Sequence, residues 1–356
     1  MISKYLQLSN ILTEKIQTGT YPLGSKIPTE IELSDAHHVS RQTVRQALSV
    51  LVDNGLINKK QGSGNRVIST GQDSNIRRIA IIASHTNDYI FPAVLHDIQT
   101  VLSLNNYSSQ IISTHNKVCL EQEALQFVIN QSLAGVLVEG VKTALPNPNL
   151  AGYQRFEKEN IPLVFFHGGY DELKHAVCVT DDNFTGGYQL TRYLISKGHT
   201  CIGGIFNSDD LQGRHRYQGY VTALHDAGLP VPDDKLLWFS TEDRYSIVDC
   251  HDLGLLNSYV KNRLSGCSAL VVYNDEIAYY MILILQTLGY DIPHAMAIVS
   301  FDNSCYCSLS PVPITSLSHE SERIGIVAAN QILRIISGKD AHSVSIPWKL
   351  IERQSG

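Results

Sequence analysis

The chain of 356 residues has no long uninterrupted hydrophobic run and no recognisable export signal. No stretch approaches the roughly 18 consecutive apolar residues that a membrane-spanning helix needs. The first seven residues, MISKYLQ, lack the apolar core and the small-residue cleavage site of a secretory signal. We therefore expect a cytoplasmic protein with no membrane contact.

Several motifs of metal sites and enzymes are missing as well. Cys305 and Cys307 are accompanied by no second Cys or His pair at zinc-like spacing, so we expect free and mostly buried thiols and no metal. No Gly-x-Gly-x-x-Gly lies between an early strand and its helix, which argues against a nicotinamide oxidoreductase. No Gly-x-Ser-x-Gly elbow indicates a hydrolase. The sequence thus predicts a protein that is not an enzyme and uses no cofactor.

Charge is distributed unevenly along the chain. The net charge of −6 comes from 28 basic and 34 acidic residues. Residues 1–70 hold eight basic and five acidic side chains, a net +3, and the remainder holds 20 and 29, a net −9. A basic segment joined to an acidic body indicates an anionic partner for one end only.

Length and local composition predict the domain organisation. At roughly 100–200 residues per domain, the chain has room for two or three. The polar, small-residue stretch 69–75 interrupts the periodic pattern and is typical of a linker. We expect a DNA-binding domain over 1–68, a linker over 69–77, and a two-lobed effector-binding and dimerisation domain over 78–356.

The first region has the pattern of a winged helix-turn-helix. Apolar residues at three- and four-residue spacing predict a helix over about 5–16. Thr29 and Glu32 make a capping box that begins a second helix, and Ser40 caps a third. Short strand-like runs flank the glycines of 62–64, which predicts a basic hairpin, the wing.

The third predicted helix suits the major groove of DNA. In such a domain this helix places its N-terminal residues over base edges, where Arg reads guanine and Gln reads adenine. Lysines suit phosphates, which position the protein without specifying sequence. A solvated helix face followed by a glycine turn is the alternative, but capping box, helix, hairpin and positive charge occur in the order that DNA binding requires. The predicted base-reading residues are Arg41, Gln42, Thr43 and Arg45.

This region resembles a known family. The segments PTEIEL at 28–33, VSRQTVRQAL at 39–48 and QGSG at 61–64 are similar to the DNA-binding domain of GntR-family bacterial transcription regulators. The similarity extends over nearly all of residues 1–68 and departs at Asn65-Arg66, where the family usually has Thr and an aromatic residue. With the lysines and the first helix included, the expected DNA contacts are Lys4, Tyr5, Lys26, Glu30, Arg41, Gln42, Thr43, Arg45, Lys60, Gln61 and Gly62.

The second region alternates short apolar runs with amphipathic stretches of helical length, such as 79–83 followed by 91–104. Strands alternating with helices predict parallel sheets covered by helices on both faces. About 280 residues exceed one small sheet, so we expect an α/β domain with two similar lobes. Ligands of such folds bind at the carboxyl ends of the strands.

Polar residues gather where these predicted strands end. Carboxylates accept hydrogen bonds from vicinal hydroxyls, Arg and Asn donate in fixed geometry, and a ring covers a C–H face, which together suit a neutral polyhydroxylated ligand. Asp182-Asn183 and Asn274-Asp275 are equally good helix N-caps, and His167 alone is more often an interior histidine. The clusters are 88–92, Glu139, 167–169, 181–183, 214–219, 274–276, Asp302-Asn303 and His319.

The second region also carries a resemblance, over about residues 77–353. The segments TDDN at 180–183, NDEIA at 274–278 and IVSFD at 298–302 are similar to the effector-binding domain of LacI/GalR regulators, a fold like that of periplasmic sugar-binding proteins. The resemblance implies sugar contacts from Arg216, Asn274 and Asp302, with His167 and His319 at further ligand positions.

A GntR-type head on a LacI-type body resembles the L-arabinose-responsive repressors of Gram-positive bacteria. The segments DYIFP at 88–92, GVLVE at 135–139 and YNDEIA at 273–278 carry the likeness, and Asn303 departs from it, since Asp is common there. The resemblance implies a homodimeric repressor of double-stranded operator DNA, released by L-arabinose. An exported or non-DNA-binding sugar-binding protein is the alternative, against which the basic head argues. The expected effector contacts are Tyr89, Phe91, Glu139, His167, Arg216, Asn274, Asp302 and His319.

Overall fold

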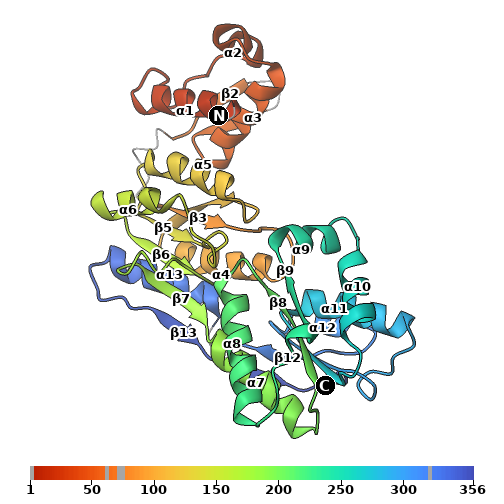
Figure 1. Cartoon of the computed structure of the whole chain (residues 1–356). Helices are drawn as coiled ribbons and strands as arrows, with labels where there is room; N and C mark the ends of the chain where they lie inside the picture. The colour runs from red at the N-terminus through yellow and green to blue at the C-terminus, as the bar shows by residue number, and fades with distance from the viewer. Residues whose placement is uncertain (1–3, 61–63, 70–76, 320–322) are drawn as a thin grey trace. The chain divides into compact units, whose positions relative to one another are not determined.

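The computed structural model describes residues 4–60, 64–69, 77–319 and 323–356. The chain divides into two compact units, Met1–Arg77 and Arg78–Gly356, and each is described separately (Figure 1). Most of the predicted linker, residues 70–76, lies outside the described residues. Within them, no helix has the length and apolar character to cross a membrane.

The first unit is a winged helix, as predicted. Its strands pair antiparallel with Ile57 opposite Val67. The buried stripe of the third helix consists of Val44, Ala47 and Leu51, together with Leu48. The elements are α1 (Lys4–Gln17), α2 (Glu30–His37), α3 (Arg41–Asp53), β1 (Ile57–Lys60) and β2 (Gly64–Val67).

Side-chain caps fix where α2 and α3 begin. The Glu32 backbone N–H donates to Thr29 Oγ1 at 3.3 Å, and the Thr29 N–H donates to the Glu32 carboxylate at 2.7 Å. The Ser40 hydroxyl accepts from the Thr43 N–H at 3.1 Å. Both predicted caps are confirmed. Between the helices His38 adopts a left-handed conformation at φ 53°, which produces the tight turn.

The second unit contains two six-stranded sheets, one per lobe, which confirms the predicted two-lobed α/β domain (Figure 1). The first sheet has the order β13-β7-β6-β5-β3-β4, and the second has the order β14-β12-β11-β10-β8-β9. The first-lobe strands are β3 (Arg77–Ala83), β4 (Tyr107–Ser113), β5 (Gly135–Val138), β6 (Leu163–Phe166), β7 (Val177–Asp181) and β13 (Val344–Ile346). The second-lobe strands are β8 (Ile202–Asn207), β9 (Leu236–Phe239), β10 (Ala269–Val272), β11 (Ala297–Phe301), β12 (Thr315–Ser318) and β14 (Lys349–Ile351).

Helices cover both faces of each sheet, which explains why central strands such as β5, β6 and β10 are apolar on both faces. In β3, Ile79 and Ile81 pack in one buried cluster with α4 and α13, while Ala80 and Ile82 pack in another with α5 and α6. Successive strand residues point to opposite faces, so a doubly covered strand has no polar side. The first-lobe helices are α4 (Phe91–Leu104), α5 (Val118–Ile129), α6 (Leu150–Lys158) and α13 (Ile324–Ile336). The second lobe has α7 (Asn183–Ser196), α8 (Leu211–Asp226), α9 (Thr241–Val248), α10 (Gly254–Arg263), α11 (Asp275–Thr287) and α12 (Tyr306–Leu309).

The chain passes between the lobes three times, after β7, after β12 and after β13. These crossings meet at Asp181, His319 and Trp348. The rings of His319 and Trp348 stack with centroids 4.1 Å apart, and His319 Nε2 lies 2.8 Å from Asp181 Oδ1. The crossings therefore lie at the β7/β13 edge of one sheet and the β12/β14 edge of the other.

Helices α7 and α8 touch backbone to backbone through two glycines. A Cβ atom on Gly219 would lie 2.0 Å from the carbonyl oxygen of Phe184, and one on Gly187 would lie 2.0 Å from that of Arg216. Backbone atoms cannot retreat as a flexible side chain can. Glycine at these positions therefore sets the position of Arg216 relative to α7.

We expect Gly219→Ala to lower the free energy of unfolding by about 1–3 kcal/mol, because the added methyl forces α7 and α8 apart. Denaturant unfolding followed by tyrosine and tryptophan fluorescence measures the loss. The matched control is Gly254→Ala, an exposed glycine whose nearest atom would be the movable Asp252 carboxylate at 3.0 Å. Equal stability of the two variants would contradict the close helix contact.

Candidate functional site

A cavity of about 400 Å³ lies between the two lobes of the second unit. Its wall is formed by residues that follow strands β3, β5 and β6 of the first lobe and β10, β11 and β12 of the second. The volume falls within the roughly 300–1,000 Å³ typical of small-molecule sites. The fold thus places its ligand-sized cavity at the carboxyl ends of the strands.

Seven of the eight sequence-predicted effector residues line this cavity, although they come from six different chain segments. They are Tyr89, Phe91, Glu139, His167, Asn274, Asp302 and His319. The remaining predicted residue, Arg216, does not line it in this structure and lies beneath its floor.

Glu139 and His167 form a buried pair on the first-lobe wall. Glu139 accepts from His167 Nδ1 at 2.8 Å, from the Ser84 N–H at 2.7 Å and from the Ser84 hydroxyl. Burial alone would lower the pKa of His167, but its hydrogen bond and attraction to Glu139 raise that pKa above the usual value. Burial alone would raise the pKa of Glu139, and the bonds from His167 and Ser84 lower it. Both shifts favour a charged pair.

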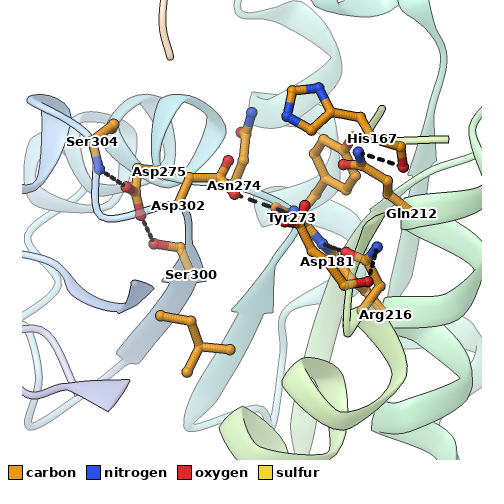
Figure 2. A network of polar contacts seen from close by, with 12 residues as sticks. His167, Asp181, Gln212, Arg216, Tyr273, Asn274, Asp275, Ser300, Asp302 and Ser304 are labelled. Carbon is orange, nitrogen blue, oxygen red and sulfur yellow. Dashed lines mark hydrogen bonds and ion pairs between the residues drawn. The ribbon is translucent and has the colours of Figure 1, made fainter. Parts of the chain in front are cut away.

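Arg216 supports the cavity floor from below (Figure 2). Its side chain is 1% exposed, its Nε donates to Asn183 Oδ1 at 2.9 Å, and its Nη1 donates to the Tyr273 carbonyl. Its Nη2 lies 3.4 Å from Asp302 Oδ1, and the guanidinium stacks 4.1 Å from the Phe301 ring centroid. The guanidinium thus has several partners before any ligand is present, and it holds Asp302.

Asp302 links the two lobes at this floor. Its Oδ2 accepts from the Tyr89 hydroxyl, which belongs to the first lobe. Tyr89, His167 and Asp302 all adopt positive φ angles, of 55°, 62° and 93°. Non-glycine residues in such conformations cost about 1–3 kcal/mol each and concentrate at ligand sites. All three of these strained residues line the cavity.

The sequence left Asp182-Asn183 and Asn274-Asp275 open as either helix caps or ligand contacts, and the structure places the two pairs differently. Asp182 caps α7 by accepting from the Thr185 N–H at 3.1 Å, and it does not line the cavity. Asn274 caps α11 by accepting from the Ile277 N–H at 3.0 Å, but it also lines the cavity. Since the cap uses only the side-chain oxygen, the amide NH₂ group remains available as a donor.

Other cavity residues were not selected from the sequence. Asp181 belongs to the predicted cluster 181–183 but was not among the expected effector contacts, and Tyr273 directly precedes Asn274, so the sequence contained a signal for both. Gln212 donates to the His167 carbonyl at 3.2 Å across the lobes, and Arg244 bonds to residues of both lobes. Neither Gln212 nor Arg244 belongs to a recognisable motif, because their roles depend on contacts between distant segments.

The assembled wall suits a neutral polyol. Glu139, Asp181 and Asp302 offer acceptors, Asn274 offers a donor, and the Phe91 ring offers an apolar face. Among the residues that the structure describes, no group of three His, Cys, Asp or Glu side chains is arranged to hold a metal ion.

In the first unit, the predicted DNA-contacting residues of α3 lie on its exposed face. Arg41, Gln42 and Arg45 are exposed, and Thr43 is partly so. Arg45 Nε bonds to Glu30 Oε2 at 2.7 Å, which brings these two predicted residues together. Lys4 and Lys26 are exposed, and Tyr5 and Glu30 are partly exposed. The Lys60 side chain and residues Gln61 and Gly62 lie outside what the structure describes.

The wing contains the exposed Arg66, at the point where the sequence departs from the family pattern. Its Nη1 donates to the Gly24 carbonyl at 2.8 Å, and its backbone bridges to Lys26. Arg66 therefore ties the second wing strand to the loop before α2.

Comparisons with known proteins define the class. Residues 4–67 match the model of the gntR family of bacterial regulatory proteins, and residues 191–356 match a periplasmic binding protein-like domain. The transcription regulator GntR of Chromobacterium violaceum superposes with a TM-score of 0.68 at 23% identity, covering 78% of this chain and 99% of that one. The regulator CcpA of Lactococcus lactis gives 0.69 at 19% identity, covering 79% and 99%. The protein is a transcription regulator with a gntR-family head and a periplasmic binding protein-like body.

Curated relatives identify the family more narrowly. The arabinose metabolism transcriptional repressor of Halalkalibacterium halodurans is 32% identical over 100% of this chain and 97% of the relative. That of Geobacillus stearothermophilus is 31% identical over 96% and 94%. The chain belongs to the family of arabinose metabolism transcriptional repressors, and it is a transcriptional repressor of sugar metabolism.

Asp275, directly after Asn274, gives the site a pH-dependent stability. Its buried carboxylate accepts from the Ser304 N–H at 2.6 Å and the Ser316 hydroxyl at 2.7 Å (Figure 2 shows the Ser304 bond). Burial and then the nearby Asp302 raise its pKa to about 6 from 3.8. The folded state therefore holds a proton that the unfolded state releases between these values, so this group's contribution to stability falls as pH rises through that window.

Asp275→Asn cannot ionise, so its stability should not fall with this carboxyl group's titration. As the pH rises from 4 to 6.5, we expect the unfolding free energy of the variant, relative to that of the unmodified protein, to increase by about 2–3 kcal/mol. Denaturant unfolding of both proteins across this range measures the difference. A difference that does not change with pH would show that Asp275 titrates normally.

Proposed function

We propose that the protein represses sugar-utilisation genes by binding operator DNA through its first unit, and that L-arabinose bound in the interlobe cavity releases it. Support for the effector comes chiefly from one observation: acceptors, an amide donor and a ring face converge on a cavity of about 400 Å³ at the strand ends. Repressors of arabinose metabolism match this chain over 96–100% of its length, which favours this pentose.

The DNA side of the proposal rests on the exposed face of α3. Arg41, Gln42 and Arg45 project from its first turns, the part that lies over base edges in winged helices. Two copies of the chain in a homodimer would place two such helices on half-sites one DNA turn apart, about 34 Å, or a multiple of it. The Arg45–Glu30 pair restricts the Arg45 side chain before it meets DNA.

The sugar acts by shifting a conformational equilibrium. It favours closed lobes because residues of both lobes contact it only when the cleft is closed, and closure changes the spacing of the two heads. A ligand shifts an equilibrium only through its affinity difference between the two states. A switch from 99:1 to 1:99 needs about 10⁴-fold preference, or about 5.5 kcal/mol.

We expect L-arabinose at millimolar concentration to raise the melting temperature of the second unit more than D-xylose or D-ribose does, because a ligand that binds the folded state stabilises it by mass action. Differential scanning fluorimetry of the full chain with each sugar measures the shift. Equal shifts for the three pentoses would refute L-arabinose as the specific effector.

Arg45→Ala is expected to weaken operator binding by about 5- to 100-fold, the loss that corresponds to one good base contact, while sugar binding persists. Fluorescence anisotropy with a labelled operator measures the affinity. Ser49→Ala, an exposed position on the same helix, is the control and should bind normally. Unchanged operator affinity of the Arg45 variant would refute α3 as the base-reading helix.

A further inference from the structure

The first turn of α9 contacts three separate loops of the opposite lobe. Asn116 Nδ2 donates to Thr241 Oγ1 at 2.6 Å, and Lys142 Nζ lies 2.7 Å from Glu242 Oε1. Arg244 Nη2, in the same turn, lies 2.8 Å from a carboxylate oxygen of Asp88. The three first-lobe partners follow β4, β5 and β3, respectively.

This turn is anchored firmly to its own lobe. A capping box begins α9: the Ser240 N–H donates to Asp243 Oδ2 at 2.8 Å, and the Asp243 N–H donates to Ser240 Oγ at 3.2 Å. Arg244 makes two bonds to buried Glu276 on α11, at 2.8 and 3.0 Å. The first turn of α9 therefore moves with the second lobe as a rigid element.

Helix α9 follows an edge strand far from the chain crossings, so its contacts should respond strongly to lobe opening. The three chain crossings lie at the β7/β13 and β12/β14 edges, whereas β4 and β9 are the opposite edges of the two sheets. Asn116 follows β4, and α9 follows β9. When lobes rotate about their crossings, the far edges separate most, so the contacts of α9 break first on opening.

The charges at this edge favour contact between the lobes. Burial alone would lower the pKa of Lys142, but its hydrogen bond to Glu242 and its attraction to Asp209 raise that pKa, so the ammonium stays charged. Lys142 Nζ is also 3.3 Å from Asp209 Oδ2, and Asp209 belongs to the second lobe. One first-lobe cation thus faces two second-lobe carboxylates. Neither Lys142 nor Glu242 lines the cavity.

We propose that the first turn of α9 is a closure latch: Lys142–Glu242 and its neighbouring interlobe contacts stabilise the closed lobes and so set sugar affinity without touching the sugar. This rests on the proposed function, since closure is read through the sugar. Lys142 and Glu242 are positioning residues. They act on the equilibrium between open and closed lobes and leave the contacts of the α3 face with DNA unchanged.

A double-mutant cycle on the full chain tests the latch. Lys142→Gln, Glu242→Gln and the double variant are titrated with L-arabinose by calorimetry. We expect each single variant to weaken the affinity by about 2- to 10-fold and the double variant to be no weaker than the worse single one, because both remove the same ion pair. Operator affinity without sugar should not fall, because weaker closure favours the open state that binds DNA. In 0.5 M salt the differences should shrink, since the pair is partly exposed.

The matched control is Glu159→Gln, which removes an exposed ion pair to Arg155 at the C-terminal end of α6, within one lobe. It should bind L-arabinose as the unmodified protein does. Small-angle X-ray scattering without sugar adds a ligand-free measurement, in which the double variant should have the larger radius of gyration.

The outcomes separate the two proposals. If the unmodified protein binds no L-arabinose, the proposed effector is refuted. The latch is then tested by scattering alone, and a larger radius of gyration in the double variant than in the unmodified protein supports it. An unmodified protein that binds L-arabinose while the Lys142 and Glu242 variants bind it equally well, with equal radii, overturns the latch.

Discussion

The buried ion pair between Arg216 and Asp302 is the constraint on which the cleft depends. A guanidinium that is 1% exposed is costly to remove from water, and this cost is offset only when every donor has a partner. Each of the three guanidinium nitrogens of Arg216 has a partner, namely Asn183, the Tyr273 carbonyl and Asp302, which belong to three different segments. Removing one partner of such a pair typically costs about 3–5 kcal/mol. The same Arg216 contacts therefore hold the floor of the cavity and the packing of the second lobe.

The pair also couples the lobes, because Asp302 accepts from Tyr89 of the first lobe. A ligand that bonds to Asp302 would replace or accompany the bond from Tyr89, and would thereby change a contact between the two lobes. At the crossings, the rings of His319 and Trp348 stack beside Asp181 and hold the connecting segments together. Floor, crossings and the far edge at α9 together define a cleft with a pivot on one side and a latch on the other.

Much of this fold was predictable from the sequence, because the signals were local. The capping residues Thr29 and Ser40 satisfy backbone donors a few positions away, so their spacing alone locates α2 and α3. Glu139, His167 and Asp302 were likewise predicted because each follows a strand, and parallel sheets bring the carboxyl ends of their strands together.

Other features depend on distant contacts that no local pattern encodes. The depth of Arg216 follows from the close approach of α7 and α8 at Gly187, which a motif does not reveal. The partners of Arg244 are 32 positions away at Glu276 and 156 positions away at Asp88. The bond from Arg66 to Gly24 likewise required the three-dimensional placement of the wing.

Release of the operator by the sugar is tested most directly by titrating the protein–operator complex with L-arabinose and following the fluorescence anisotropy of the labelled DNA. We expect the sugar to release the operator. Phe91→Ala, which removes the ring face of the cavity, should bind the operator normally but need a much higher sugar concentration for release. Release at the same concentration in both proteins, or no release in either, would contradict this expectation.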